Sequence, residues 1–310
     1  MLIGQVGCGP WGANVLRDLR TLGCEVAVAA RHGASRDRAT VGGASCVVET
    51  IRQLTDLPDI LGFVVVNDIG SHAPAIEELL PQGLPIFVEK PLCSDPDDAA
   101  RLALLGSDTV FLMDKWRYHP GIRALKHLID SGGVGDLIGM RTRRNQWGSN
   151  HADAEAPWTL MPHDLAIIDE LLGSVPAIEH AVADYVGGRV QGIAVTFGTS
   201  PWASVESFAR APRSEREVLV FGSEATAVLS DGWSDHIQVF RGDPDTHPAT
   251  PEIIQTPGEL PLLAELREFV EYLRGGPTPR AGVARAAEHV HILANVIATA
   301  KLRGTTSSPS

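Results

Sequence analysis

A glycine-rich turn close to the start of the chain constrains its fold more than any other feature. Residues 2–6 form a short apolar run, and the spacing Gly7-x-Gly9-x-x-Gly12 follows that run directly. Apolar residues on one helical face come next and end at Gly23, so the pattern is strand, turn and helix. In that context the glycines permit a tight turn, close approach of the backbone to a pyrophosphate, and close packing of helix on strand. The alternative is a glycine turn that binds no ligand.

The alternation of strand and helix continues through the first third of the chain. Residues 63–66 are an uninterrupted apolar run, which is typical of a parallel strand covered on both faces. Ser94 is predicted to cap a helix, because aspartates that favour a helix start follow it. The sequence therefore predicts an α/β fold with a doubly wound parallel sheet. The other predicted elements are strands at 25–30, 86–88 and 110–113 and a helix at 72–80.

Length and charge narrow the classes of protein. At 310 residues the chain exceeds the size at which one hydrophobic core usually stops growing, so we expect two domains. A net charge of −12 repels phosphate backbones and anionic membranes, and we expect neither nucleic acid nor membrane as a partner. No apolar run approaches the roughly 20 residues of a membrane span, and the N-terminus lacks the pattern of a signal peptide. The four cysteines show no CxxC spacing and no cluster with histidine, which predicts a cytoplasmic protein without disulfides or a metal site.

The end of the second predicted strand indicates which dinucleotide the chain prefers. Rossmann units that bind NAD usually carry Asp or Glu there, where it accepts from the ribose 2′-hydroxyl. Here Arg31 follows the strand, and Ser35, Arg36 and Arg38 come soon after. A guanidinium can stack on adenine and pair with a 2′-phosphate, which a carboxylate would repel. These residues predict NADP(H) over NAD(H); the alternative is a solvated cluster of surface arginines.

One segment gives the chain a family resemblance. Phe87-Val-Glu-Lys-Pro-Leu92 resembles the Glu-Lys-Pro signature of the glucose–fructose oxidoreductase, inositol dehydrogenase and rhizopine catabolism (Gfo/Idh/MocA) family. The opening glycine turn resembles that family as well. The segment at 161–165 is most similar to members that act on sugar nucleotides. Further matching segments are Ser71-His72 and Trp116-Arg-Tyr-His-Pro120.

The resemblance implies a second domain built on a large, mostly antiparallel open sheet. It divides the chain into an NADP-binding Rossmann domain over 1–115, a substrate and oligomerisation domain over 116–303, and a flexible tail over 304–310. Short strand patterns at 190–197 and 203–208 support the second domain independently. In the family one face of this sheet often joins subunits, which implies a homodimer or homotetramer.

Two residues are the candidates for catalysis. Oxidation of a secondary alcohol needs a base for the hydroxyl proton and a group that polarises the C–O bond. Lys90 follows an apolar strand and by resemblance hydrogen-bonds the reacting oxygen; a solvated lysine in a proline turn is the alternative. His163 lies in the first turn of a predicted helix, whose dipole favours the neutral imidazole that a base requires. A packing or capping histidine is the alternative.

Thr159 departs from the family pattern. Many members carry an aspartate four residues before the matching histidine, and Thr159 stands at that place. Asp164 cannot be assumed to replace it, because neighbouring side chains on a helix point in different directions. Either the proton relay is simplified, or the enzyme runs mainly as a ketone reductase in which Lys90 alone protonates the alkoxide.

The remaining candidate residues are expected around these two. Arg141 and Arg143 share one face of a predicted strand, with Arg144 opposite, and the pair either holds a substrate phosphate or belongs to a solvated face. The predicted cofactor-binding residues are Gly7, Gly9, Pro10, Trp11, Gly12, Arg31, Ser35, Arg36, Asn67, His72, Glu89, Lys90 and Arg117. The predicted substrate-binding residues are Lys90, Tyr118, Asn145, Trp147 and His163.

These features favour one function over two others. They indicate an oxidoreductase that moves a hydride between a nicotinamide and a secondary alcohol or ketone of a sugar, a cyclitol or a nucleotide-linked sugar. Reduction of an imine or a non-sugar ketone on the same scaffold is the first alternative. A cofactor-binding sensor without turnover is the second; the presence of Lys90 and His163 argues against it, and Thr159 slightly favours it.

Overall fold

The chain forms two compact units, which are described separately. The computed structural model describes residues 1–148, 154–242, 245 and 250–304, with side chains up to residue 301. The first unit comprises Met1–Lys115 and Leu260–His291, and the second comprises Trp116–Glu259 and Ile292–Ser310. The predicted tail lies almost entirely outside the described residues.

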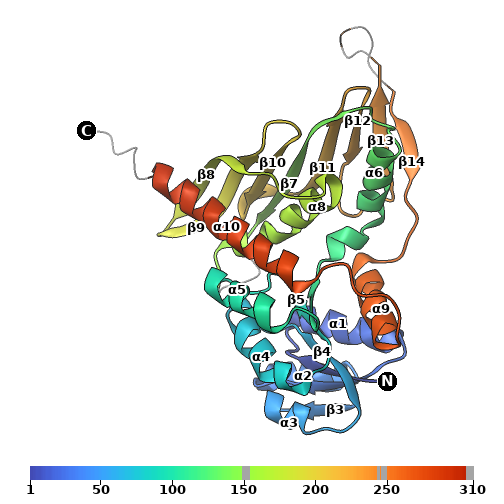
Figure 1. Cartoon of the computed structure of the whole chain (residues 1–310), viewed down its shortest axis with the longest axis vertical. Helices are drawn as coiled ribbons and strands as arrows, with labels where there is room; N and C mark the ends of the chain where they lie inside the picture. Colours follow the sequence, from blue (N-terminus) through green and yellow to red (C-terminus); the bar gives the residue numbers. More distant parts are fainter. Residues whose placement is uncertain (149–153, 243–244, 246–249, 305–310) are drawn as a thin grey trace. The chain divides into compact units, whose positions relative to one another are not determined.

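The first unit contains a six-stranded sheet with the order β3-β2-β1-β4-β5-β6. Its strands β3, β4 and β5 are labelled in Figure 1. All of its neighbouring strands are parallel. This is the strand order of a doubly wound dinucleotide-binding sheet, so the predicted Rossmann fold is confirmed. Its strands are β1 (Leu2–Val6), β2 (Glu25–Ala29), β3 (Cys46–Val48), β4 (Ile60–Val65), β5 (Ile86–Glu89) and β6 (Val110–Met113).

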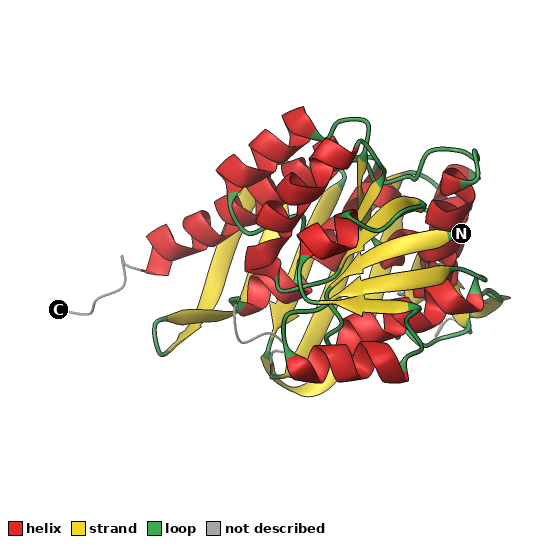
Figure 2. Cartoon of the chain, turned by 90° about the horizontal axis from the view of Figure 1, so that it is seen from below, coloured by secondary structure: helices red, strands yellow, loops and turns green. Residues whose placement is uncertain are grey.

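Helices cover both sides of this sheet, as Figure 2 shows. On one side α1 packs against α2 and α9, and on the other α4 packs against α3 and α5. The short 3₁₀ helices η1 (Ile69–Ser71) and η2 (Leu80–Gln82) flank α4. The helices are α1 (Pro10–Thr21), α2 (Gly33–Val41), α3 (Ile51–Thr55), α4 (His72–Leu79), α5 (Pro96–Leu105) and α9 (Pro261–Leu273).

Helix α9 differs from the predicted domain division. The sequence interpretation gave everything after residue 115 to the second domain, yet α9 belongs to the first unit. Leu262, Leu266 and Phe269 are buried in the core of this unit. Phe269 stacks on Phe87 of β5, with ring centroids 4.8 Å apart. The apolar face of α9 therefore covers one side of the parallel sheet.

The second unit is built on an eight-stranded sheet with the order β14-β13-β12-β11-β7-β10-β9-β8. Strands β7 and β10 are parallel, and every other neighbouring pair is antiparallel. The predicted large, mostly antiparallel sheet is therefore confirmed. Its strands are β7 (Leu137–Trp147), β8 (Ile178–Val186), β9 (Arg189–Phe197), β10 (Trp202–Phe208), β11 (Arg210–Gly222), β12 (Ala225–Leu229), β13 (His236–Arg241) and β14 (Glu252–Gln255).

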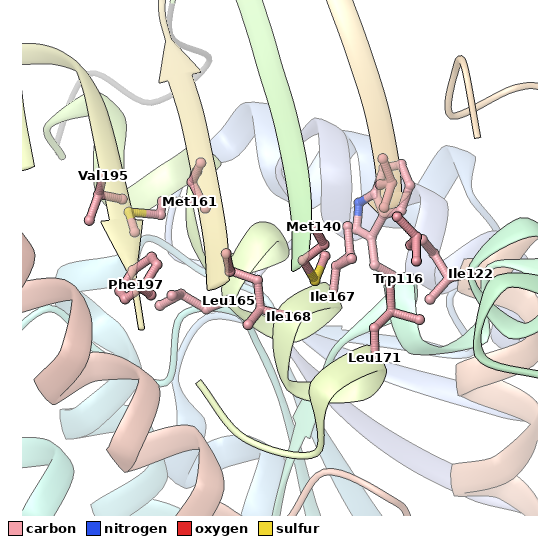
Figure 3. Close-up of a cluster of buried hydrophobic side chains, with 14 of the residues drawn as sticks. Trp116, Ile122, Met140, Met161, Leu165, Ile167, Ile168, Leu171, Val195 and Phe197 are labelled. Atoms are coloured by element: carbon pink, nitrogen blue, oxygen red, sulfur yellow. The ribbon is translucent and has the colours of Figure 1, made fainter. Parts of the chain in front are cut away.

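Helix α8 fills the core beneath this sheet. Its residues Leu165 and Ile168 belong to the same hydrophobic core as Val195 and Phe197 of β9 (Figure 3). No helix of the described residues is long and apolar enough to cross a membrane. The helices that contribute to this unit are η3 (Lys115–Tyr118), α6 (Pro120–Asp130), α7 (Ala156–Leu160), α8 (Pro162–Leu172) and the second half of α10 (Val283–Gly304).

Candidate cofactor and catalytic sites

The glycine turn between β1 and α1 has the geometry that a dinucleotide site requires. Gly7 has a φ of +94°, and a Cβ atom there would lie 2.8 Å from the backbone nitrogen of Asn67. A Cβ atom on Gly12 would lie 2.9 Å from the carbonyl oxygen of Gly7. At Gly9 a Cβ atom would meet nothing within 4 Å. The first and third glycines are therefore required by packing, and the second leaves open space beside the backbone.

Helix α1 begins at this turn without a side-chain cap. Gly9 is its N-cap, and Pro10 occupies the first turn. The first N–H groups of a helix have no partner within the helix, and together with the helix dipole they form a site for an anion. The turn and the helix start are thus suited to a pyrophosphate.

The arginines that follow β2 differ in their contacts, although they form one cluster in the sequence. Arg36 donates to the carbonyl oxygen of Arg31 at 2.6 Å and lies 3.3 Å from the carboxylate of Glu49. Arg31 itself is exposed, and its guanidinium has no ion pair with any described residue. It directly precedes His32, the N-cap of α2, which also lacks a side-chain cap. Arg31 is therefore available to a ligand at the start of α2, whereas Arg36 is held by its own chain.

Charged side chains gather at the carboxyl ends of β5 and β6. Glu89 ends β5 and Lys90 follows it, while Asp114 and Lys115 follow β6. The Lys115 ammonium lies 4.3 Å from the ring centroid of Trp11 in the glycine turn. Burial raises the pKa of Glu89, and the positive charges of Lys90 and Lys115 oppose that rise. Lys90 thus lies within a charged cluster at the ligand-binding edge of the sheet.

Glu265 of α9 adds a carboxyl group that sequence reasoning missed. Its side chain is 1% exposed, and no side chain of the described residues hydrogen-bonds either carboxyl oxygen. Burial, followed by the negative charges of Glu89 and Asp114, raises the pKa of Glu265 well above its usual value; Lys115 and the backbone of Asp114 offset only part of this rise. The helical spacing was the signal that could have found it, because Glu265 lies three residues after Leu262 and four before Phe269, on the apolar face of α9.

His72 supports the site from within the protein. Its ring is 1% exposed, with Nδ1 2.9 Å from the carbonyl oxygen of Pro91 and Nε2 3.1 Å from that of Asn67. The ring thereby joins the segment after β4 to the loop after Lys90. These contacts suit a residue that positions the two loops, and direct contact of His72 or Asn67 with a cofactor stays a prediction.

In the second unit His163 lies at the start of α8, as predicted. It is 9% exposed, and its ring centroid lies 6.4 Å from that of Trp116. Trp116 in turn stacks on His119, with centroids 4.9 Å apart. His163 therefore has an aromatic wall on one side.

Asp164 forms a buried ion pair with Arg144. The Arg144 Nε donates to both carboxylate oxygens of Asp164, at 3.2 and 3.1 Å, and its guanidinium lies 4.5 Å from the ring centroid of Trp116. Burial raises the pKa of Asp164, while the charge of Arg144 lowers it. The Thr159 hydroxyl donates to the carbonyl of Ala156 at 2.9 Å. Asp164 is thus paired with Arg144, and whether it replaces the aspartate missing at Thr159 stays a prediction.

Arg117 and Tyr118 lie in η3 and are buried. The Arg117 guanidinium bonds Asp169 and also Glu170, the latter at 3.0 Å. It therefore ties η3 to α8, the helix that begins near His163. Contact of Arg117 with a cofactor and of Tyr118 with a substrate stay predictions.

Asn145 and Trp147 on β7 differ in whether their side chains are free to contact a ligand. The amide of Asn145 donates to Glu215 at 2.8 Å and accepts from the Phe208 N–H at 3.2 Å, so it holds neighbouring strands together. Trp147 is 75% exposed at the end of the strand. Of the two, only Trp147 has a side chain open to a ligand.

Arg141 and Arg143 lie on the more exposed face of β7, and Arg144 is buried on the other, as predicted. Arg141 pairs with Glu217 at 2.7 Å, and Arg143 pairs with Glu206 at 3.0 Å. With both guanidiniums engaged by carboxylates, the structure favours the solvated strand face over a phosphate site.

Comparison with known proteins agrees with this geometry. Residues 1–108 match the model of the Gfo/Idh/MocA oxidoreductase family, described as having an NAD-binding Rossmann fold. Inositol 2-dehydrogenase of Ralstonia nicotianae is 29% identical over 199 residues, 61% of this chain and 56% of that protein. The same enzyme from Gluconacetobacter diazotrophicus is 24% identical over 229 residues, 70% of this chain and 67% of that protein. This chain thus spans a little more than half of the first relative.

Solved structures share the fold over almost the whole chain. Levoglucosan dehydrogenase in complex with NADH and levoglucosan has a TM-score of 0.84 at 17% identity, covering 97% of each chain. UDP-N-acetylglucosamine 3-dehydrogenase GnnA from Acidithiobacillus ferrooxidans has a TM-score of 0.82 at 15% identity, covering 97% of this chain and 98% of that one. Through its first 108 residues the chain matches the Gfo/Idh/MocA family of oxidoreductases, and over almost its whole length it shares the fold of these solved structures.

Proposed function

We propose that the chain is an NADP(H)-dependent dehydrogenase or ketoreductase acting on a secondary alcohol or ketone of a sugar, cyclitol or nucleotide-linked sugar. The observation that carries the proposal is Lys90 in a charged cluster beside an open glycine turn. The names of the relatives support the substrate class, since they act on inositol, levoglucosan or a UDP-linked sugar. In this proposal the first unit holds the cofactor, and the second supplies the substrate site and the subunit contacts.

The residues of the first unit fit a nicotinamide dinucleotide. The turn at Gly9 and the uncapped start of α1 would hold the pyrophosphate, and Arg31 would pair with the 2′-phosphate. The nicotinamide supplies hydride transfer when it is bound. The protein's part is to orient that ring and to manage the proton of the substrate.

Lys90 and His163 divide the work on the proton in this proposal. The Lys90 ammonium donates a hydrogen bond to the reacting oxygen and stabilises the negative charge that develops there. The positive charge of Lys90 lowers the pKa of the buried Glu89 beside it, against the effect of burial. His163 accepts the hydroxyl proton in the direction of oxidation. Thr159 cannot serve as a carboxylate relay, so Lys90 is expected to carry more of the catalysis than His163.

The direct test is turnover with a panel of substrates. NADP(H) absorbance would be followed with myo-inositol, levoglucosan, UDP-N-acetylglucosamine and their keto forms. Turnover of one of these polyols or ketones supports the proposal. Cofactor binding without turnover of any sugar-like compound would favour the sensor function instead.

Replacement of Lys90 tests the catalytic assignment. Lys90→Ala is expected to lower kcat roughly 10²–10⁴-fold with cofactor affinity preserved, because a positioned proton donor contributes about that much. Lys126→Ala is the matched control, since Lys126 pairs with Asp130 on the surface of α6. Near-normal turnover in Lys90→Ala on the true substrate would contradict the assignment.

A further inference from the structure

The carbonyl oxygens of the glycine turn are held by side chains. A backbone segment that binds a pyrophosphate must point N–H groups toward it, because carbonyl oxygens carry partial negative charge and repel phosphate. Three carbonyls of this turn, those of Gly7, Cys8 and Gly12, each accept a hydrogen bond from a side chain elsewhere in the first unit. Two residues supply all three bonds.

Gln5 supplies two of them from inside the sheet. It lies on β1, between β2 and β4, and is fully buried. Its Nε2 donates to the carbonyl of Gly7 at 2.8 Å and to that of Gly12 at 3.0 Å. Buried strands of a parallel sheet are usually apolar throughout, so a glutamine there needs a reason. One amide group that joins both ends of the turn fixes how tightly the turn closes.

Arg38 supplies the third bond from α2. Its Nε donates to the carbonyl of Cys8 at 2.9 Å, and its Nη2 donates to the Ser35 hydroxyl at 3.2 Å. Burial raises the pKa of the Cys8 thiol, and the positive charge of Arg38 opposes that rise. Arg38 thus satisfies the hydrogen-bond acceptor of the Cys8 carbonyl and adds positive charge beside the anion site.

We infer that Gln5 and Arg38 are positioning residues that hold the glycine turn in its anion-binding form. The inference rests on the proposed function, because it takes the turn to bind the pyrophosphate of a nicotinamide dinucleotide. The pyrophosphate is common to NAD(H) and NADP(H). Loss of Gln5 must therefore weaken both cofactors by the same factor, unlike loss of Arg31.

Gln5→Leu is the main test. We expect the dissociation constants of NADPH and NADH each to rise about tenfold, since two hydrogen bonds that hold the turn are lost. The melting temperature without cofactor should fall, because the carbonyls of Gly7 and Gly12 lose their donor, and the packing of leucine in the apolar core offsets only part of that loss. At saturating cofactor kcat should return to the wild-type value, because Gln5 touches no reacting atom.

Gln53→Leu is the matched control. Gln53 forms the capping box of α3 with Thr50, and its side-chain hydrogen bonds go to Glu49 and Thr50 rather than to the turn. Its loss should also lower the melting temperature but leave both dissociation constants unchanged, unlike the loss of Gln5. The two variants therefore separate stability from cofactor affinity.

The outcomes divide as follows. Unchanged dissociation constants in Gln5→Leu, whatever its melting temperature, overturn the inference for Gln5. Arg38→Lys gives an independent reading if Gln5→Leu does not fold: it keeps the charge but loses the guanidinium geometry, and both constants should rise at least threefold. Unchanged constants there overturn the inference for Arg38. A wild-type protein that binds neither NADPH nor NADH contradicts the proposed function itself.

Discussion

At the scale of single residues, Arg31, Arg36 and Arg38 show how pairing separates side chains that look alike in the sequence. Arg36 and Arg38 donate to carbonyls of the chain, and Arg31 does not. The sequence could predict an arginine cluster after β2, because the missing acidic residue is visible there. It could not predict which arginine stays available, since that depends on where the carbonyls of distant segments lie.

Arg31→Ala should remove most of the preference for NADPH. We expect NADPH affinity to fall roughly ten- to a hundred-fold while NADH affinity changes little, because only NADPH carries the 2′-phosphate. Titration of both cofactors by fluorescence measures this. Arg52→Ala, at an exposed arginine on α3, serves as the control. Equal losses for both cofactors in Arg31→Ala would contradict the assignment.

Glu265→Gln should change how stability depends on pH. The pKa of Glu265 is raised above its usual value of 4.5, so its neutral form stabilises the fold at low pH, and that stability is lost as the pH rises through the raised pKa. Glutamine cannot ionise. The variant should therefore be more stable than wild type at pH 8, by roughly 1–3 kcal/mol, and the difference should shrink toward pH 4.5.

Melting temperatures between pH 4.5 and 9 provide the measurement for Glu265. Glu271→Gln is the control, because Glu271 is exposed on the same helix and should show no pH-dependent difference. A constant offset between Glu265→Gln and wild type across the whole range would mean that this carboxyl does not change protonation there.

At the scale of elements, the start of α5 shows that residue type alone does not identify the N-cap of a helix. Ser94 was predicted as the N-cap, but Asp95 is, accepting from the backbone N–H groups of Asp97 at 2.8 Å and Asp98 at 3.1 Å. The prediction was wrong by one residue. Pro96 was the signal that could have corrected it, because proline favours the first helical position and the residue before it is then the cap.

Asp95→Ala is expected to destabilise the protein by about 1 kcal/mol, since it removes the side chain that caps α5. Urea unfolding followed by circular dichroism measures the change. Ser94→Ala should have little effect, because Ser94 is exposed and precedes the cap. A larger loss in Ser94→Ala than in Asp95→Ala would refute this capping assignment.

The partners of buried polar residues in the second unit could not be predicted from the sequence. The spacing of residues 141, 143 and 144 predicted which faces of β7 they share, because side chains alternate along a strand. It did not predict that Arg144 meets Asp164, which requires β7 and α8 to be packed first. Lys90 and His163 were found through family motifs, while Gln5 and Glu265 belong to no motif.

At the scale of the whole molecule, we propose that the chain assembles through its second unit into a dimer or tetramer. Strand β8 at the edge of the eight-stranded sheet exposes Val182, Tyr185 and Val186. Apolar side chains on a sheet edge favour association with another chain. This edge strand is a candidate subunit contact in addition to the sheet face that the family resemblance implies.

Light scattering of the full chain tests this assembly. Wild type should have two or four times the monomer mass of 33.1 kDa, and Val186→Asp should shift the distribution toward the monomer. Val41→Asp, at an exposed valine on α2, is the control and should change nothing. A monomeric wild type would contradict the proposal.

The return of α9 to the first unit has a consequence for biosynthesis. The last strand of the parallel sheet leaves the ribosome with Met113, but Phe269, the stacking partner of Phe87, is translated only after the entire second sheet. At ordinary translation rates the delay is on the order of ten seconds, long compared with helix formation. During that interval the apolar patch around Phe87, which α9 later covers, stays exposed beside α1 on the nascent Rossmann sheet and offers a surface on which chaperones act. The first unit reaches completion only when synthesis is nearly over.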